Sequence, residues 1–282
     1  MAPTDTPVAV SAPGKVLLAG GYLVLDRNYT GLVFGLSARI NVIAGAIHTG
    51  PGVQLNEIVV DSPQFVDAQW RYGYHAAPAE GGIKVTQLQV GPDTQQPNPF
   101  VETTLSYALT FVQHVLDEQQ QQQQQSGKTA AAAAAAASHS LSPVRLIILA
   151  DNDYYSQSTP TITGAGAAGR FPRFTVPLSK ANKTGLGSSA ALVTSLTAAV
   201  LSHYLPRAAF DMASPGGQQT LHNLGGSTTR LGASRCKAAA AAAAAGRKGR
   251  GSRKRRRRGC ACQRASCCAC ATSTAAARRS AW

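Results

Sequence analysis

Residues 183–192 read KTGLGSSAAL, and this stretch decides how the rest of the chain is interpreted. Apolar residues follow it at three- and four-residue spacing as far as Tyr204, and Pro206 stands just beyond them. That spacing predicts a helix that begins directly after the glycines. The first turn of a helix carries unpaired backbone N–H groups and a partial positive charge, so this loop could hold an anion.

Three interpretations of the loop compete. Gly and Ser are common before helices, so a capped turn without a ligand is one of them. GLGSSA also fits the dinucleotide pattern G-x-G-x-x-A, and Asp211 follows about 20 residues later. That fingerprint needs a strand running directly into the loop, whereas Pro177 and the polar residues 179–184 intervene here. A phosphate cradle in a kinase is the third, although the pattern G-x-x-x-x-G-K-[ST] is absent.

Charge and cysteine are concentrated at one end of the chain. The 282 residues suffice for one large or two small domains, and the formal net charge is +14. Residues 1–229 hold 12 Lys/Arg and 13 Asp/Glu, whereas residues 230–282 hold 15 Lys/Arg and no acid. A nearly neutral body gives no reason to expect a nucleic-acid footprint on the fold. All six cysteines also lie after residue 235, so no disulfide framework supports the body.

The N-terminus shows no signal peptide, and no stretch approaches the roughly 20 apolar residues that span a bilayer. We therefore expect a soluble globular body in the cytoplasm, with the peroxisome as the alternative location.

Apolar runs predict the strands of the body. Residues 8–10 and 16–19 indicate two strands with a turn or one bent strand. Residues 32–44, 58–60 and 83–90 are further candidates, and VRLIIL at 144–149 is the best buried strand. Residues 156–173 are typical of a loop, and Phe174 and Val176 could start a short strand.

One further helix has a clear start. Asn98 can cap it, and Pro99 fits its first position. Apolar residues then recur with helical spacing from Val101 to Leu116. The all-Gln run 119–125 and the all-Ala run 130–137 offer too little apolar variety to pack a core, so residues 118–140 are interpreted as a solvated insertion.

Two motifs in order suggest a family. KTGLGSSAALVTSLTAAVL resembles the second motif of the galactokinase, homoserine kinase, mevalonate kinase and phosphomevalonate kinase superfamily, and SAPGKVLLAGGYLVLD at 11–26 resembles its first. Lys183-Thr184 before the loop and Gly20-Gly21-Tyr22 after the first strand look most like the phosphomevalonate kinase family. NPFVETTLSYAL and LIILADNDYYS are similar to its intervening segments, so the resemblance covers about residues 8–224.

The resemblance implies an α+β fold, the N-terminal nucleotide-binding domain of such kinases, like domain 2 of ribosomal protein S5, over residues 1–226. It implies ATP and Mg²⁺ as cofactors and 5-phosphomevalonate as the substrate that receives a phosphoryl group. By position, Lys15 would be catalytic and reach the transferred phosphoryl. Nucleotide-binding residues would be Lys183, Gly185, Leu186, Gly187, Ser188, Ser189 and Ala190, with Ser188 and Ser189 also near the metal.

The resemblance ends after Leu224. The family continues with a Gly-rich stretch whose aspartate is the catalytic base, and no acidic residue follows Asp211 in this chain. Asp211 lacks a preceding Gly-rich run, so we interpret it as a surface-loop residue. We expect a missing C-terminal domain, and at most weak nucleotide binding with negligible phosphoryl transfer.

Residues 227–282 are basic, rich in Cys and Ala, and predicted to be unstructured. GRGSRKRRRR suggests binding to nucleic acid or an anionic surface, which is the alternative function. The cysteine spacing indicates a soft-metal site only weakly, and out-of-frame or intronic sequence is the favoured explanation of the segment.

Overall fold

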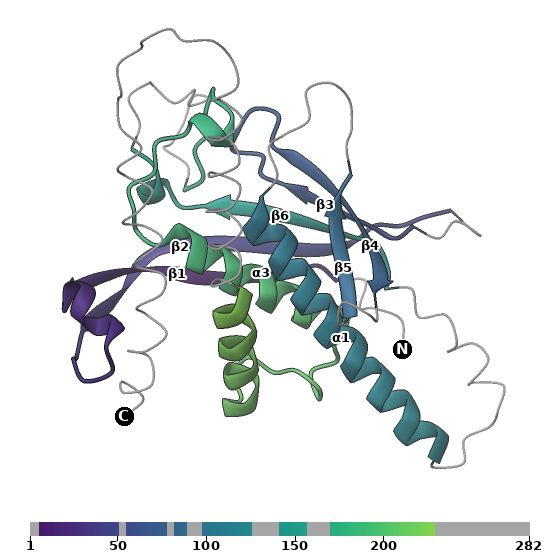
Figure 1. Ribbon diagram of the computed structural model, residues 1–282. Helices are drawn as coiled ribbons and strands as arrows, with labels where there is room; N and C mark the ends of the chain where they lie inside the picture. Colours follow the sequence, from purple (N-terminus) through teal and green to yellow (C-terminus); the bar gives the residue numbers. More distant parts are fainter. Residues whose placement is uncertain are drawn as a thin grey trace, which may run out of the picture.

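A six-stranded mixed sheet organises the chain (Figure 1). The computed structural model describes residues 6–50, 55–77, 82–88, 98–125, 141–156 and 170–228. The strand order is β1-β2-β6-β3-β4-β5, with only the β3–β6 pair parallel among these strands. The strands are β1 (Val8–Ala19), β2 (Leu32–Ala46), β3 (Glu57–Asp61), β4 (Gln69–Ala77), β5 (Gly82–Gln87) and β6 (Val144–Ala150).

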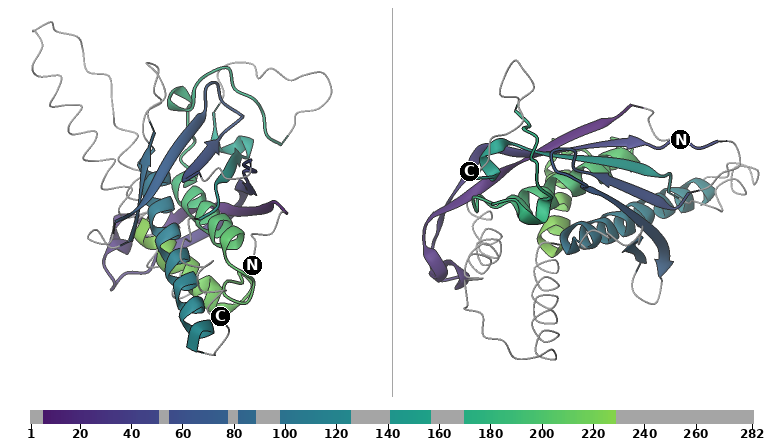
Figure 2. Two further views of the ribbon diagram at one scale, coloured as in Figure 1. Left: turned by 90° about the vertical axis from the view of Figure 1, so that its right-hand side faces the viewer. Right: turned by 90° about the horizontal axis from the view of Figure 1, so that it is seen from above.

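Two long helices pack on one face of this sheet (Figure 2). Helix α1 (Pro99–Gln125) lies against β5, α3 (Ser188–Tyr204) lies against β1 and β2, and the two helices contact each other. Residues 215–228 form a further helical segment. Short 3-10 turns are η1 (Gly21–Leu25), η3 (Asn152–Tyr154) and η4 (Leu178–Lys180). The architecture is mixed α/β.

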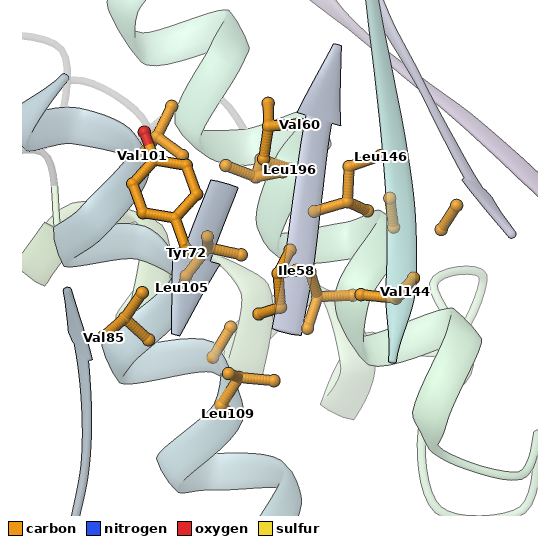
Figure 3. Close-up of a cluster of buried hydrophobic side chains, with 14 of the residues drawn as sticks. Ile58, Val60, Tyr72, Val85, Val101, Leu105, Leu109, Val144, Leu146 and Leu196 are labelled. Carbon is orange, nitrogen blue, oxygen red and sulfur yellow. The ribbon is translucent and has the colours of Figure 1, made fainter. Parts of the chain in front are cut away.

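The main core fills the space between the sheet and the helices (Figure 3). Ile58 and Val60 of β3 and Leu146 of β6 meet Leu105 of α1 and Leu196 of α3, and all are fully buried. Each such side chain contributes about 1.5–3 kcal/mol when it leaves water. The core therefore fixes α3, and with it the loop that precedes α3, on the sheet.

Most strand predictions hold, but one strand was missed and one predicted strand is absent. The first two runs form one strand, whose pairing with β2 shifts between Pro13 and Lys15, so the bent strand is the correct alternative. Residues 144–149 form a central strand with a neighbouring strand on both edges, and Val144 and Leu146 are buried in the core. Strand β4 was not predicted, although Trp70, Tyr72 and Tyr74 alternate inward along it.

Two local findings go beyond the predictions. Residues 118–125, predicted as part of a solvated insertion, are helical, because α1 continues through the Gln run to Gln125; unbranched Gln is a good helix former. Phe174 and Val176 form no strand. They instead make single backbone hydrogen bonds, from the Phe174 amide to the Gln64 carbonyl oxygen (2.7 Å) and from the Val66 amide to the Val176 carbonyl oxygen (3.3 Å).

The capped start of α1 is confirmed, because Asn98 Oδ1 accepts a hydrogen bond from the Val101 amide at 3.4 Å. In the described ranges, no helix is both long and apolar enough to cross a bilayer. The Ala run, most of the predicted 156–173 loop, and the basic and Cys-rich residues 229–282 lie outside the described residues.

Candidate phosphate-binding site

Lys15 and the glycine-rich loop are in direct contact. The Lys15 amide donates a hydrogen bond to the Leu186 carbonyl oxygen at 3.1 Å. A Cβ placed on Gly187 would lie 3.0 Å from Lys15 Cγ and 3.5 Å from Lys15 Cε, so the lysine stem runs over this glycine. The irregular pairing of β1 at Pro13–Lys15 turns the strand at this point. Residues about 170 positions apart in sequence thus share one site.

The start of α3 is suited to an anion. Gly187 is its N-cap residue in the left-handed region (φ 75, ψ 31), and Gly185 has φ 82. No side chain caps this N-terminus, and its first turn has no acidic residue. Hydrogen bonding to the Gly187 carbonyl begins only with the amides of Ala190 and Ala191. The earliest amides of the helix are therefore available to phosphate oxygens.

Residues that follow β6 form hydrogen bonds with the glycine-rich loop and the residues just before it. The Thr184 amide donates to the Tyr154 carbonyl oxygen (3.0 Å), and its hydroxyl donates to the Asp153 carbonyl oxygen (2.7 Å). The Ser156 amide donates to the Asn182 carbonyl oxygen at 2.9 Å, next to a β-bridge between Tyr155 and Lys183. Of these residues, only Lys183 is predicted from the sequence to have a binding role.

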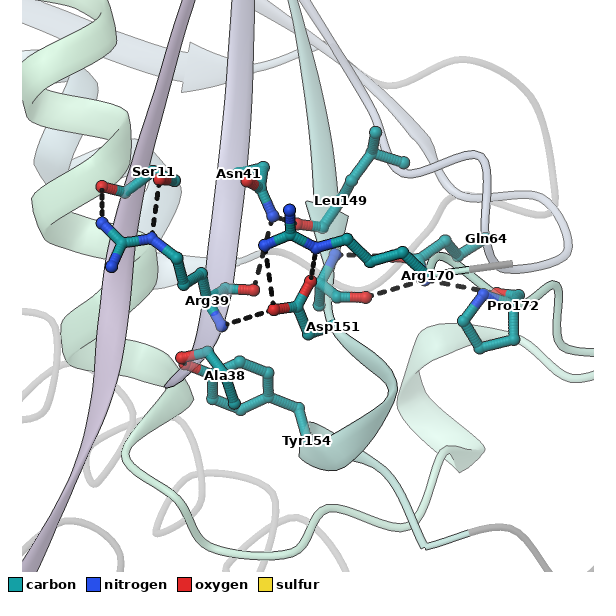
Figure 4. A network of polar contacts seen from close by, with 11 residues as sticks. Ser11, Ala38, Arg39, Asn41, Gln64, Leu149, Asp151, Tyr154, Arg170 and Pro172 are labelled. Atoms are coloured by element: carbon teal, nitrogen blue, oxygen red, sulfur yellow. Dashed lines mark hydrogen bonds and ion pairs between the residues drawn. The ribbon is translucent and has the colours of Figure 1, made fainter. Parts of the chain in front are cut away.

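A polar network joins the first motif to the end of β6 (Figure 4). The Asp151 carboxylate accepts from the Arg39 amide (2.8 Å) and from Arg170 Nε (2.7 Å) and Nη2 (3.1 Å). Arg39 Nε donates to Ser11 Oγ at 2.8 Å. Because Asp151 is buried and paired with a bidentate arginine, it holds β1, β2 and β6 in register beside the site.

Only some of the predicted site residues contact one another. Lys15, Leu186 and Gly187 touch one another, and Ser188 to Ala190 form the first turn of α3. Lys183 and Gly185 are exposed on the loop. Ser188 and Ser189 are successive, half-buried residues of this first turn.

Asp211 has a structural position. It lies after the C-terminal end of α3, whereas the loop precedes the N-terminal end. Its carboxylate accepts a hydrogen bond from the Ala213 amide at 3.1 Å. Its carbonyl accepts the Ser214 hydroxyl at 2.8 Å, and Ser214 Oγ in turn accepts the Gly217 amide at 3.0 Å. These contacts shape the turn that starts the helical segment 215–228, in agreement with the loop interpretation.

The site offers Mg²⁺ hydroxyls rather than carboxylates. Across the parts of the chain that are described, no group of three or more His, Cys, Asp or Glu side chains could hold a metal ion. Mg²⁺ retains several waters and is commonly held through substrate phosphates with one or two protein ligands. One serine hydroxyl at the start of α3 is compatible with such a site.

Comparison of the sequence with known proteins finds that the chain is similar to phosphomevalonate kinases. The chain is 64% identical over 217 residues to a phosphomevalonate kinase of Gibberella zeae, covering 77% of this chain and 44% of the relative. It is 40% identical over 243 residues to one of Aspergillus fumigatus, again covering 77% of this chain and 44% of the relative. The chain thus spans less than half the length of these relatives. No protein-family model matches it.

A solved structure also resembles the chain. Streptococcus pneumoniae phosphomevalonate kinase in complex with phosphomevalonate and AMPPNP superposes with a TM-score of 0.37 and 16% identity, covering 79% of this chain and 42% of that one. A TM-score this low does not by itself establish a common fold.

The site consists of a glycine-rich loop that opens a helix beside a lysine, in a mixed α/β domain. Over the aligned residues the chain is a homologue of the phosphomevalonate kinases, so the family indicated by its two motifs is confirmed.

Proposed function

We propose that the chain binds Mg-ATP between Lys15 and the first turn of α3, as the nucleotide-binding part of a phosphomevalonate kinase. In the reaction proposed, the γ-phosphoryl group of ATP is transferred to a phosphate oxygen of 5-phosphomevalonate, which yields ADP and 5-diphosphomevalonate. The observation that carries this proposal is the contact of Lys15 with Leu186 and Gly187. The names of the relatives support the substrate.

The chemistry fits the groups at the site. Phosphoryl transfer depends mainly on positioning the reactants and on cations placed against charge that spreads in the transition state. The α3 amides would hold phosphate oxygens, and the Lys15 ammonium would reach the transferred group. Ser188 or Ser189 would face Mg²⁺, and Lys183 would add positive charge at the loop.

We further propose that turnover by this chain is negligible. The general base of the reaction is not assigned, because no acidic residue follows Asp211 and Asp211 itself shapes a turn. Loss of a general base typically lowers the rate by about 10²–10⁴. The alternative function through the basic tail depends on residues outside the described ranges, and no contact in the described part favours it.

The test is direct binding of AMPPNP with Mg²⁺ to the full 282-residue chain. We expect Lys15→Ala to weaken binding roughly 10- to 100-fold, as for loss of a hydrogen bond to a charged group. Lys180→Ala is the matched control, because Lys180 is an exposed lysine of η4 before the loop. Equal affinity of the two variants would reject the site.

Turnover is measured in the same preparations as ADP release with phosphomevalonate and Mg-ATP. We expect no release above the level of Lys15→Ala. Robust release that depends on Lys15 would overturn the proposal of negligible turnover and make Asp211 the next residue to replace.

A further inference from the structure

Tyr154 lies where β1, β2 and the glycine-rich loop meet. It is 1% exposed and belongs to a small cluster that is separate from the main core. The cluster contains Ala12 of β1, Ala38 and Ile40 of β2, Ala150 of β6 and Ala191 of α3. Tyr154 is the largest fully buried side chain of this cluster, and four of its five buried neighbours are alanines.

Polar atoms of Tyr154 connect two of these segments. Its phenol hydroxyl donates to the Ala38 carbonyl oxygen of β2 at 3.1 Å (Figure 4). Its backbone carbonyl accepts the Thr184 amide of the loop at 3.0 Å. Burial raises the pKa of Tyr154 to about 12, with Asp151 adding to the effect, so the phenol remains a hydrogen-bond donor at neutral pH.

The third connection runs through Gly14. A Cβ on Gly14 would lie 2.7 Å from Tyr154 Oη and 2.8 Å from the Leu186 carbonyl oxygen, so the missing side chain allows both to approach. The same Leu186 oxygen accepts the amide of the next residue, Lys15. A displacement of the phenol would therefore be passed to Gly14 and Lys15 directly, without any intervening side chain.

We infer that Tyr154 is a positioning residue, whose phenol on the Ala38 carbonyl sets the placement of Lys15 against the glycine-rich loop. It touches neither phosphate nor metal in this assignment. The inference deepens the proposed function, because Lys15 is the residue that would reach the transferred phosphoryl group.

The deciding measurement is hydrogen exchange at the Lys15 amide, which requires no nucleotide. Tyr154→Phe keeps the ring and removes the hydroxyl. We expect the Lys15 amide to exchange about fivefold faster, the factor that one ordinary hydrogen bond provides. Tyr204→Phe is the matched control, because that hydroxyl also donates to a backbone carbonyl, Ser142 at 2.6 Å, from the far end of α3. It should leave the Lys15 amide unchanged.

Unchanged exchange in Tyr154→Phe, or an equal increase in both variants, would overturn the inference.

AMPPNP binding then separates this inference from the proposed function. If the folded wild-type chain does not bind AMPPNP, the proposed function fails, whereas the exchange result still decides the role of Tyr154. If it binds, Tyr154→Phe should weaken binding about fivefold in the wild-type background and not in Lys15→Ala. Equal weakening in both backgrounds would show that Tyr154 does not act through Lys15.

Discussion

At the scale of single residues, two glycines of the loop share a backbone conformation and differ in their surroundings. Gly185 and Gly187 both have positive φ, which costs other residues roughly 1–2 kcal/mol. A Cβ on Gly185 meets nothing within 4 Å, whereas one on Gly187 meets the Lys15 stem. A side chain at position 185 would therefore cost backbone strain alone, whereas one at position 187 would cost backbone strain and a steric contact with Lys15.

We therefore predict that Gly187→Ala lowers the free energy of unfolding more than Gly185→Ala does. The measurement is urea denaturation of both variants, in the wild-type and the Lys15→Ala backgrounds. Truncating Lys15 removes Cγ and Cε, so the excess cost of Gly187→Ala should shrink there. An excess that persists undiminished in Lys15→Ala would show that Lys15 does not occupy the space over Gly187.

His203 gives the chain a pH dependence. It is 3% exposed near the end of α3, and neither ring nitrogen has a hydrogen-bond partner among the described residues. Burial lowers its pKa in the folded state below the usual value of about 6.5. As the pH falls below about 6.5, the unfolded chain binds this proton more readily, so stability decreases toward the lowered pKa.

We predict that His203→Leu has a flatter stability profile than wild type between about pH 7 and pH 5, because no proton is then bound on unfolding. Thermal unfolding across this range is the measurement. His114→Gln, at an exposed position of α1, is the control and should keep the wild-type slope. A slope that survives in His203→Leu would assign the acid sensitivity to other groups.

At the scale of secondary-structure elements, a glutamine side chain supplies the backbone hydrogen bonds at the end of β6 that a neighbouring strand would otherwise make. Gln64 Nε2 donates to the Ala150 carbonyl oxygen (2.9 Å), and Gln64 Oε1 accepts the Ala150 amide (2.6 Å). Gln64 is 2% exposed, and its amide also reaches the Pro172 carbonyl at 3.2 Å. One side-chain amide thus takes the place of a neighbouring strand where β6 leaves the sheet.

Replacing Gln64 with Ala should lower the free energy of unfolding by about 1–3 kcal/mol, the cost of leaving buried polar groups unpaired. The control is Gln219→Ala, which removes an exposed amide bonded to the exposed Asn223 side chain at 2.9 Å and should cost less than about 0.5 kcal/mol. Chemical denaturation of both variants compares them. Similar losses would show that Gln64 does not complete the strand.

At the scale of the whole molecule, the end of the β1–β2 hairpin together with η1 projects from the sheet (Figure 1). Its large apolar side chains are exposed, with Tyr22 70% and Leu18 65% accessible. This hairpin patch consists of Val16, Leu18, Tyr22, Leu23, Leu25, Tyr29, Leu32 and Phe34. Clustered exposed apolar residues favour association, unlike single ones scattered over a surface.

We predict that the chain self-associates through the hairpin patch as its concentration rises. The double variant Tyr22→Ser, Leu25→Ser should reduce association in sedimentation velocity without lowering the melting temperature, since both side chains are already exposed. Met212→Ser removes an exposed apolar side chain outside the patch and should change nothing. Undiminished association of the double variant would exclude the patch.

The sequence alone determined most of the local elements and the family. Helical spacing after Gly187 and the cap at Asn98 predicted α3 and α1, because both signals depend on residues only a few positions apart. The near-continuous apolar run at 144–149 predicted a buried strand; β6 has a neighbour on both edges, but only one of its faces is buried, since Arg145 is exposed. The order of the two motifs predicted the family that the relatives confirm.

Only the tertiary structure decided which distant residues meet. Strand β4 is different, because the alternation of Trp70, Tyr72 and Tyr74 is a local signal that the sequence analysis missed. Tyr154 carries no motif of its own, and its role depends on Gly14, Ala38 and Thr184 approaching from three separate segments. Packing between segments far apart in sequence sets these contacts, and no local periodicity or propensity encodes them.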